Sequence, residues 1–218
     1  MAQFAVQRRC MVDGQLRTNR VVDEALIAAL LEIPRERFVP DRLASVAYVD
    51  RDLPLEGGRF VMEPMVFARL VQLLAVSPGD VVLDIGCATG YSSAVLSRLC
   101  STVVALECDS GLAETARLNL AESDIDNVIV VDGPLGEGYP DQAPYNAILL
   151  GGAVPEIGSA LTDQLADDGR VAGVVADGPG PGCATCATRA GERISSRVAF
   201  DANTPPLPGF ARAERFVL

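Results

Sequence analysis

The sequence predicts an α/β fold in which helices cover both faces of a mainly parallel, seven-stranded sheet. Five short apolar runs rich in Val, Ile and Leu are typical of buried strands. Helical stretches separate these runs, and such alternation is typical of parallel sheets. The tail, residues 183–199 and 213–218, has no helical period and predicts antiparallel strands at one end of the sheet.

The N-terminal part of the chain predicts mainly helices. We expect a helix over 1–17, a helix over 24–31, a short turn or helix over 35–40, a loop over 47–55 and a helix over 64–74. Asp23 is a suitable N-cap for the second helix, which should stop before Pro34. Pro64 suits the first turn of the last helix, where a missing N–H leaves no hydrogen bond unmade.

The middle of the chain predicts strands and helices in alternation. The strands are expected over 81–85, 103–107, 128–131, 145–150 and 170–175, and the helices over 91–99, over 110–121 with Ser110 as its cap, and over 155–165. In open α/β sheets, ligands bind beyond the carboxyl ends of the strands. Asp84, Gly86 and Glu107 should therefore lie on one rim of the sheet. The loops after Val131 and Leu150 should reach the same rim.

The length of 218 residues suits a single domain with a full core. We expect residues 1–77 to form a helical cover on the substrate side, residues 78–176 the ligand-binding core and residues 177–218 the C-terminal antiparallel strands. The sequence has no apolar run long enough to span a bilayer and no secretory leader, so we expect a cytoplasmic protein without a membrane partner. A formal net charge of −11 argues against a nucleic-acid partner, which needs a basic face.

The chain contains no His and no Lys. Every basic side chain is therefore Arg, which stays protonated and cannot act as a base at neutral pH. Two of the six cysteines, Cys183 and Cys186, form a C-x-x-C pattern. A zinc site would need two further ligands at matching spacing, and no His is present to supply them, so we expect no metal site.

A glycine-rich turn follows the first predicted core strand. A dinucleotide-binding fingerprint would need glycines where the chain has Ala88 and Tyr91, so that interpretation fails at two of three positions. The pattern present is an acid, a glycine, a small residue and a second glycine at alternate positions: Asp84, Gly86, Ala88 and Gly90. It resembles the first motif of the S-adenosylmethionine-dependent methyltransferases of the Rossmann-like class.

A second acid supports a nucleoside ligand. The next predicted strand ends at Glu107, 21 residues after Gly86. A carboxylate at this offset can accept hydrogen bonds from both hydroxyls of a ribose. Neither motif alone is specific, and the alternative is an ordinary strand-to-helix turn without a ligand.

Most of the chain resembles the protein-L-isoaspartate O-methyltransferases. The similar segments are 34–40, 47–50, the glycine-rich approach to Pro64, the glycine motif with Tyr91, 138–140, 143–146, 155–157 leading to Leu165, and 169–170. The resemblance implies a Rossmann-like, doubly wound fold and S-adenosylmethionine as methyl donor. It also implies that the acceptor is the free carboxylate of isoaspartyl residues in damaged proteins or peptides. Such transfer needs no base, because the acceptor is already ionised near pH 7.

The chain departs from the family pattern on the acceptor side. Members typically carry Thr-Ile-Ser-Gln-Pro before the helix, whereas Met62 and Glu63 stand here at the serine and glutamine positions. A thioether cannot donate a hydrogen bond, and a carboxylate would repel an anionic acceptor. The family's Gly-Asp-Gly after the third strand is matched by Asp132 and Gly133, with the first glycine lost.

These patterns predict a site but leave its chemistry open. The residues expected to bind the donor are Asp84, Gly86, Cys87, Ala88, Gly90, Tyr91, Glu107, Asp132 and Gly133, and those expected beside the acceptor are Met62 and Glu63. The leading hypothesis is isoaspartyl carboxyl methylation. The alternatives are a methyltransferase with another acceptor and a donor-binding family member without catalysis. The oligomeric state stays open.

Overall fold

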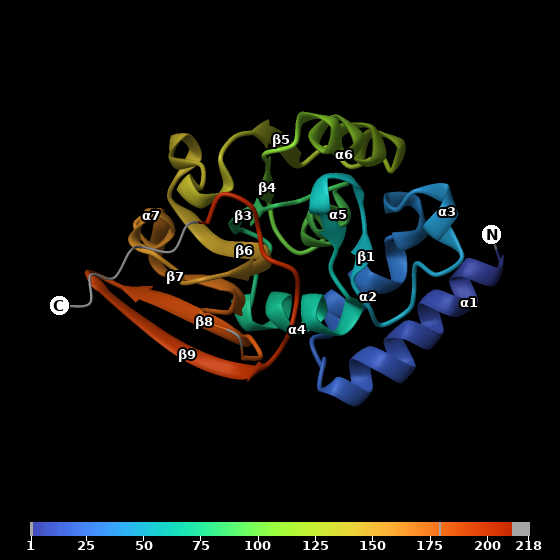
Figure 1. Cartoon of the computed structure of the whole chain (residues 1–218), viewed down its shortest axis with the longest axis horizontal. Coiled ribbons are helices and arrows are strands. Elements are labelled where there is room, and N and C mark those ends of the chain that lie inside the picture. The colour runs from blue at the N-terminus through green and yellow to red at the C-terminus, as the bar shows by residue number, and fades with distance from the viewer. Residues whose placement is uncertain (1, 179, 211–218) are drawn as a thin grey trace.

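The computed structural model describes residues 2–178 and 180–210, and its main sheet has the expected architecture (Figure 1). The strands are β3 (Val81–Ile85), β4 (Thr102–Glu107), β5 (Val128–Asp132), β6 (Tyr145–Val154), β7 (Leu165–Val175), β8 (Cys183–Ala190) and β9 (Arg193–Asp201). Their order in the sheet is β5-β4-β3-β6-β7-β8-β9. Neighbours among β3 to β7 are parallel, while β7–β8 and β8–β9 are antiparallel. The carboxyl ends of β3, β4 and β6 therefore share one rim.

Alternate residues of each central strand pack on opposite faces of the sheet. In β3, Val82 belongs to one buried cluster and Leu83 to the other, and β4 repeats this with Val103 and Val104. Apolar residues of α4 (Pro64–Leu74), α5 (Tyr91–Leu96) and α6 (Ser110–Glu122) pack with the first face. The second face is covered by the short α7 (Ser159–Thr162) and the 3-10 turn η5 (Leu135–Glu137), together with Tyr139 and Ala143 on either side of the 3-10 turn η6 (Pro140–Gln142).

The helix predicted over 155–165 is much shorter in the structure. It is reduced to α7, and Leu165 already begins β7. The reason is strand pairing: the carbonyl of Gln164 accepts a hydrogen bond from the backbone N–H of Tyr145 at 2.8 Å, which draws the chain into the sheet beside β6.

Carboxylate caps begin two helices. Asp23 accepts hydrogen bonds from two backbone N–H groups in the first turn of α2 (Glu24–Glu32), as expected. In α6 the cap is Asp109 and not the predicted Ser110, because the Asp109 carboxylate accepts from the N–H groups of the first turn. Each such cap contributes about 1 kcal/mol to helix stability.

The N-terminal segment docks against the glycine loop. It consists of α1 (Ala2–Met11), the π-helical turn η1 (Val12–Leu16), the 3-10 turn η2 (Arg17–Asn19), α2, the 3-10 turn η3 (Arg35–Phe38) and α3 (Asp41–Ala44). Arg35 is fully buried; one guanidinium nitrogen donates to the carbonyl of Met62 at 2.7 Å, and the group lies 4.7 Å from the ring centre of Tyr91. The hydroxyl of Thr89, within the loop, donates to the carbonyl of Phe38.

A small hairpin precedes α4. Its strands β1 (Leu53–Pro54) and β2 (Phe60–Val61) pair antiparallel through two residue pairs, and the 3-10 turn η4 (Glu56–Gly58) joins them. The end of the loop predicted over 47–55 is therefore a short strand. This hairpin carries Arg59 toward the carboxyl end of β4.

The segment after β9, residues 202–210, returns across the end of β6. Leu207 donates its backbone N–H to the carbonyl of Ala153 at 2.8 Å, and Ala153 donates to the carbonyl of Pro205 at 2.9 Å. The antiparallel strands predicted near 183–199 are confirmed as β8 and β9, whereas those predicted over 213–218 lie outside the described residues. Within the described part, the helices are all too short or too polar to span a bilayer.

Candidate active site

The glycine loop turns sharply between β3 and α5. Gly86 (φ 80°) and Gly90 (φ 93°) both adopt the left-handed backbone region that glycine enters without steric penalty. The N–H of Gly86 donates to the carbonyl of Leu106 at 2.8 Å, which joins the loop to the end of β4. A Cβ at Gly90 would lie 3.3 Å from that of Ala116, so the second glycine also allows close packing of the loop on α6.

Ala88 is strained at the position between these glycines. Its φ of 51° is left-handed, which costs a non-glycine residue about 1–2 kcal/mol. Ala88→Gly would remove this strain but give the unfolded chain more freedom, which offsets about 0.5–1 kcal/mol. We expect a net gain of about 0.5 kcal/mol in the free energy of unfolding, measured by urea denaturation. Ala121→Gly, on the exposed surface of α6, is the matched control and should be destabilising; a similar loss at Ala88 would contradict the strain.

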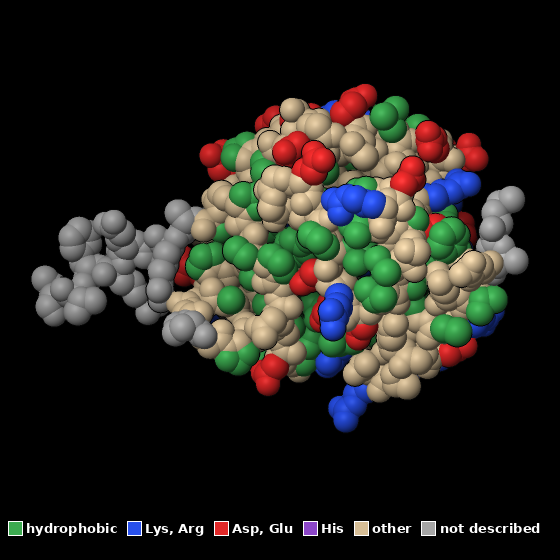
Figure 2. Space-filling model, turned by 45° about the vertical axis from the view of Figure 1, so that its right-hand side comes forward, with side chains coloured by type: hydrophobic (Ala, Val, Ile, Leu, Met, Phe, Trp, Pro, Cys, Tyr) green, Lys and Arg blue, Asp and Glu red, His purple; other side chains and the backbone are tan. Residues whose placement is uncertain are grey.

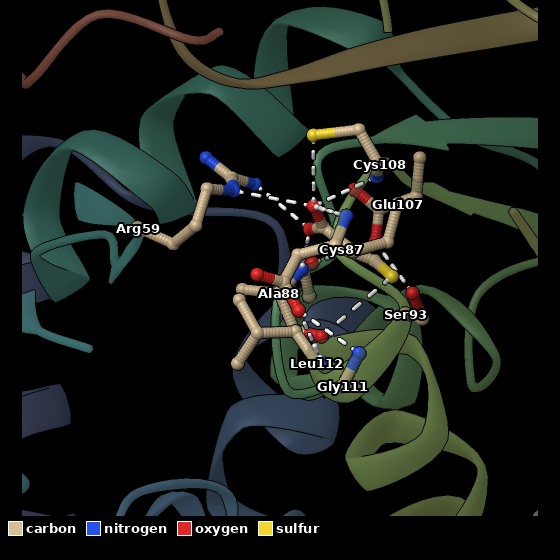
Figure 3. A network of polar contacts seen from close by, with 11 residues as sticks. Arg59, Cys87, Ala88, Ser93, Glu107, Cys108, Gly111 and Leu112 are labelled. Atoms are coloured by element: carbon tan, nitrogen blue, oxygen red, sulfur yellow. Dashed lines mark hydrogen bonds and ion pairs between the residues drawn. The ribbon is translucent and has the colours of Figure 1, made fainter. Parts of the chain in front are cut away.

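Glu107 is the centre of a buried polar network (Figure 3). Its side chain is 0% exposed, and its carboxylate accepts from the backbone N–H groups of Ala88 (2.8 Å), Cys108 (2.9 Å) and Asp109 (3.2 Å). Arg59 adds a two-pronged ion pair, with Nη2 2.9 Å from Oε2 and Nε 3.3 Å from Oε1. Burial raises the pKa of Glu107, but the hydrogen bond and charge of Arg59 outweigh it, so that the pKa lies below its usual value.

Asp84 lies fully buried inside the same rim. Its Oδ2 accepts hydrogen bonds from the hydroxyls of Ser92 and Ser93, both at 2.6 Å. Its Oδ1 has no hydrogen-bond partner among the described residues. Burial raises the pKa of Asp84 to about 6, although the two serines lower it in part. A buried acceptor of this kind suits a cationic ligand group.

The chemistry of this rim fits the donor predicted from the sequence, but side chains of the chain itself fill the space. A Cβ on Gly86 would lie 2.7 Å from Nη2 of Arg59 and 2.7 Å from Cδ2 of Leu207. The cavity bounded by Met62, Gly86 and Tyr91 has a volume of about 20 Å³. That is room for a water molecule at most.

Met62 and Glu63, the two residues predicted to lie beside the acceptor, join the hairpin to α4. The side chain of Met62 is buried, and it borders the same small cavity. The backbone N–H of Glu63 donates to Oδ1 of Asp52 at 2.9 Å, and Asp50 accepts from the N–H of Met65 at 3.2 Å. Partial burial, with the nearby charges of Asp50 and Asp52, raises the pKa of Glu63 to about 7.

Of the remaining residues predicted to bind the donor, most lie at the rim, but the side chain of Asp132 is paired elsewhere. Cys87 is buried and, like Tyr91, lines the small cavity. Gly133 donates its N–H to the carbonyl of Glu107 at 3.0 Å, which places it at the rim. Asp132 lies opposite Glu107 in the strand register, but its carboxylate forms an ion pair with Arg117 on α6. Its contact with a donor stays a prediction.

The sequence alone does not indicate that Arg59 and Leu207 fill the site. Arg59 carries a signal only in hindsight, as an arginine directly after two glycines and before a buried strand. Leu207 lies about 120 residues from Gly86, and no periodicity could have paired them. Asp50 and Asp52 fall in the loop predicted over 47–55, and nothing in the sequence indicates that their carboxylates approach Glu63.

The chain is similar to known methyltransferases over most of its length. A family model described as protein-L-isoaspartate(D-aspartate) O-methyltransferase matches residues 7–179. The protein-L-isoaspartate O-methyltransferase of Methanoregula boonei is 41% identical over 165 residues, which cover 76% of either chain. The Koribacter versatilis protein of the same name is 39% identical over 168 residues, 77% of this chain and 76% of that protein.

Solved structures agree. One protein-L-isoaspartate O-methyltransferase superimposes with a TM-score of 0.80 at 26% identity and covers 93% of this chain and 67% of its own. A Plasmodium falciparum protein, described as a putative protein-L-isoaspartate O-methyltransferase in complex with S-adenosyl-L-homocysteine, has a TM-score of 0.77 at 18% identity. The match covers 93% of this chain and 98% of the other, and at this identity it supports the fold alone. The chain belongs to the protein-L-isoaspartate(D-aspartate) O-methyltransferase family, whose methyl donor is S-adenosylmethionine.

Proposed function

We propose that this chain transfers the methyl group of S-adenosylmethionine to the free side-chain carboxylate of isoaspartyl residues in damaged proteins. The observation that supports the proposal is the joint placement of Asp84, Glu107 and the glycine loop on one rim, where Met62 borders the same small cavity as the loop. Family membership at about 40% identity supports the same reaction.

Two acids would hold the donor. The Glu107 carboxylate would accept the ribose hydroxyls, and Oδ1 of Asp84, which has no partner among the described residues, would accept a hydrogen bond from a cationic group of the donor. When bound, the donor supplies a methyl group on a positively charged sulfur. The loop from Gly86 to Gly90 would present backbone N–H groups and small side chains to it.

The acceptor needs orientation rather than activation. A carboxylate is already ionised near pH 7, so a chain without His or Lys can carry out this transfer. The buried side chain of Met62 would exclude water from the reacting atoms. Glu63, with a pKa of about 7, is neutral in part of the molecules at pH 7. In that form it can donate a hydrogen bond to an anionic acceptor instead of repelling it.

This role of Glu63 predicts a pH dependence. Below pH 7 its carboxyl is mostly protonated, and above pH 7 it ionises and repels the acceptor. The KM for an isoaspartyl peptide should rise by up to about fivefold between pH 7 and 8 in the wild type, because the protonated fraction of Glu63 falls from about one half to about one tenth. In Glu63→Gln the KM should stay flat over this interval. Steady-state kinetics at several pH values measure this, and parallel pH profiles for the two proteins would exclude the role.

The reaction itself is tested with donor labelled in its methyl group. Purified protein is incubated with paired peptides that differ only in an aspartyl or an isoaspartyl linkage, and base-labile label is followed. A methyl ester hydrolyses readily in base, whereas an N-methyl or ether product does not. We expect label on the isoaspartyl peptide alone. Label on neither peptide would favour another acceptor or a non-catalytic role, provided that calorimetry on the same sample confirms binding of the donor.

A further inference from the structure

Arg59 occupies the place where the donor's ribose would bind. The side chains of Arg59 and Glu107 are 2% and 0% exposed, and the guanidinium points at the carboxylate from the hairpin side (Figure 3). One nitrogen of the guanidinium, Nη1, has no hydrogen-bond partner among the described residues. The pair is therefore enclosed, but its hydrogen bonding is incomplete.

The carboxylate of Glu107 has no capacity left for two ribose hydroxyls. A carboxylate offers about four lone-pair positions. Three are taken by the backbone N–H groups of Ala88, Cys108 and Asp109, and Arg59 adds two further donors. The backbone donors belong to the loop and to the start of α6, whereas Arg59 belongs to a separate hairpin. Arg59 is thus the partner that can leave without unfolding the rim.

The turn of the hairpin is held more weakly than its strands, whose Leu53, Phe60 and Val61 are buried in the core. Two residue pairs form the ladder, and the exposed turn contains Gly57 and Gly58 at φ 62° and 73°. Leu55 and the turn also border a cavity of about 370 Å³ between η3 and α6, so the turn is not packed on that side. Exposed turns at the end of a short ladder open at low free energy.

We propose that Arg59 is an internal competitor of the methyl donor and sets its affinity. With the donor site empty, Arg59 neutralises the buried carboxylate of Glu107. Donor binding requires the hairpin turn to open, so that the guanidinium leaves Glu107 and the ribose hydroxyls take its place. Leu207 fills the adjoining space over Gly86 and must shift as well. This inference rests on the proposed assignment of Glu107 to the ribose.

Calorimetric titration with S-adenosylhomocysteine, the demethylated donor, tests the competition. Removing the guanidinium should tighten binding, so we expect Arg59→Gln to bind at least about tenfold more tightly than the wild type. Arg59→Lys keeps a cation but loses the two-pronged contact with Glu107, so its affinity should lie between those of the wild type and Arg59→Gln. Arg98→Gln removes an arginine from a surface pair with Glu32 and should change nothing.

The outcomes separate this inference from the proposed function. Equal affinity of the wild type and Arg59→Gln would overturn the competition and leave the donor site standing. Absence of binding to a folded Arg59→Gln would overturn both. Wild-type hydrogen exchange provides a test that needs no variant: S-adenosylhomocysteine should speed exchange at the amides of Leu55 and Arg59, which bond across the hairpin turn. Unchanged or slower exchange at both amides in the saturated protein would contradict the opening.

Discussion

Glu107→Gln is expected to lower the free energy of unfolding by about 3–5 kcal/mol at pH 7. The substitution leaves the guanidinium of Arg59 buried without its counter-charge, and it weakens the acceptor for three backbone N–H groups. Glu32→Gln is the matched control, because its partner Arg98 lies at the surface, and it should cost no more than about 1 kcal/mol. Urea denaturation of both variants measures the difference.

A double-mutant cycle attributes the loss to the pair. Arg59→Gln combined with Glu107→Gln should be less destabilising than the sum of the two single changes, by about 1–3 kcal/mol. Because Arg59 holds the pKa of Glu107 below its usual value, this stabilisation is present above the unfolded pKa and is lost as the pH falls through the folded one. Additive effects at pH 7 would contradict a stabilising pair.

The same cycle isolates the contribution of Glu107 to donor binding. In the Arg59→Gln background the internal competitor is gone, so any further change reports hydrogen bonds to the ligand itself. There, Glu107→Gln should weaken the binding of S-adenosylhomocysteine by about 1–3 kcal/mol, as expected when hydrogen bonds to a charged group are lost. Unchanged affinity by calorimetry would rule out the ribose assignment.

Asp84→Asn should have the opposite effect on stability. Burial raises the pKa of Asp84 to about 6, so the native state resists its ionisation while the unfolded chain ionises near its usual value. As the pH rises from about 4 to 6, the unfolded state releases the proton first and stability falls. At pH 8 the asparagine avoids this penalty, and we expect a gain of about 1–3 kcal/mol. At pH 5, midway through this interval, only about half of the gain should remain.

The comparison between pH 5 and pH 8 separates the effect of the Asp84 charge from other effects of the substitution. Glu122→Gln, at an exposed position of α6, should leave stability nearly unchanged at both. A gain for Asp84→Asn that is equal at pH 5 and pH 8 would show that the charge of Asp84 does not matter. The variant should also bind S-adenosylhomocysteine more weakly, because a neutral amide replaces the acid proposed to face the cationic group.

The sequence alone could predict that Asp84, Gly86 and Glu107 lie on one rim of the sheet, because strand ends and turn spacing are local properties. Asp84 and Glu107 each occur at or near the end of an apolar strand, and parallel strands bring such ends together whatever the details of packing. The left-handed turn at Gly86 was likewise visible as a glycine after a buried strand.

The contents of the site could not be predicted because they depend on long-range packing. Arg59 reaches Glu107 across 48 positions of the chain, and Leu207 crosses Gly86 through a return segment that has no periodic pattern. The prediction of a helix over 155–165 was wrong for a related reason: backbone pairing with Tyr145 overrode the local helical preference and left only α7.

Charged side chains of both signs are interspersed on one face of the molecule (Figure 2). On the face drawn in Figure 2, the arginine side chains stand apart from one another, with acidic and apolar side chains between them. This distribution is consistent with the formal net charge of −11, which reflects 29 acidic against 18 basic side chains.

A crystal structure with S-adenosylhomocysteine tests the donor site most directly, because it locates the ligand and Arg59 together. We expect both ribose hydroxyls within about 3 Å of the Glu107 carboxylate, with the guanidinium of Arg59 withdrawn from it. A ligand bound elsewhere, with Arg59 and Glu107 still paired as in the free protein, would contradict the assignment of the donor site.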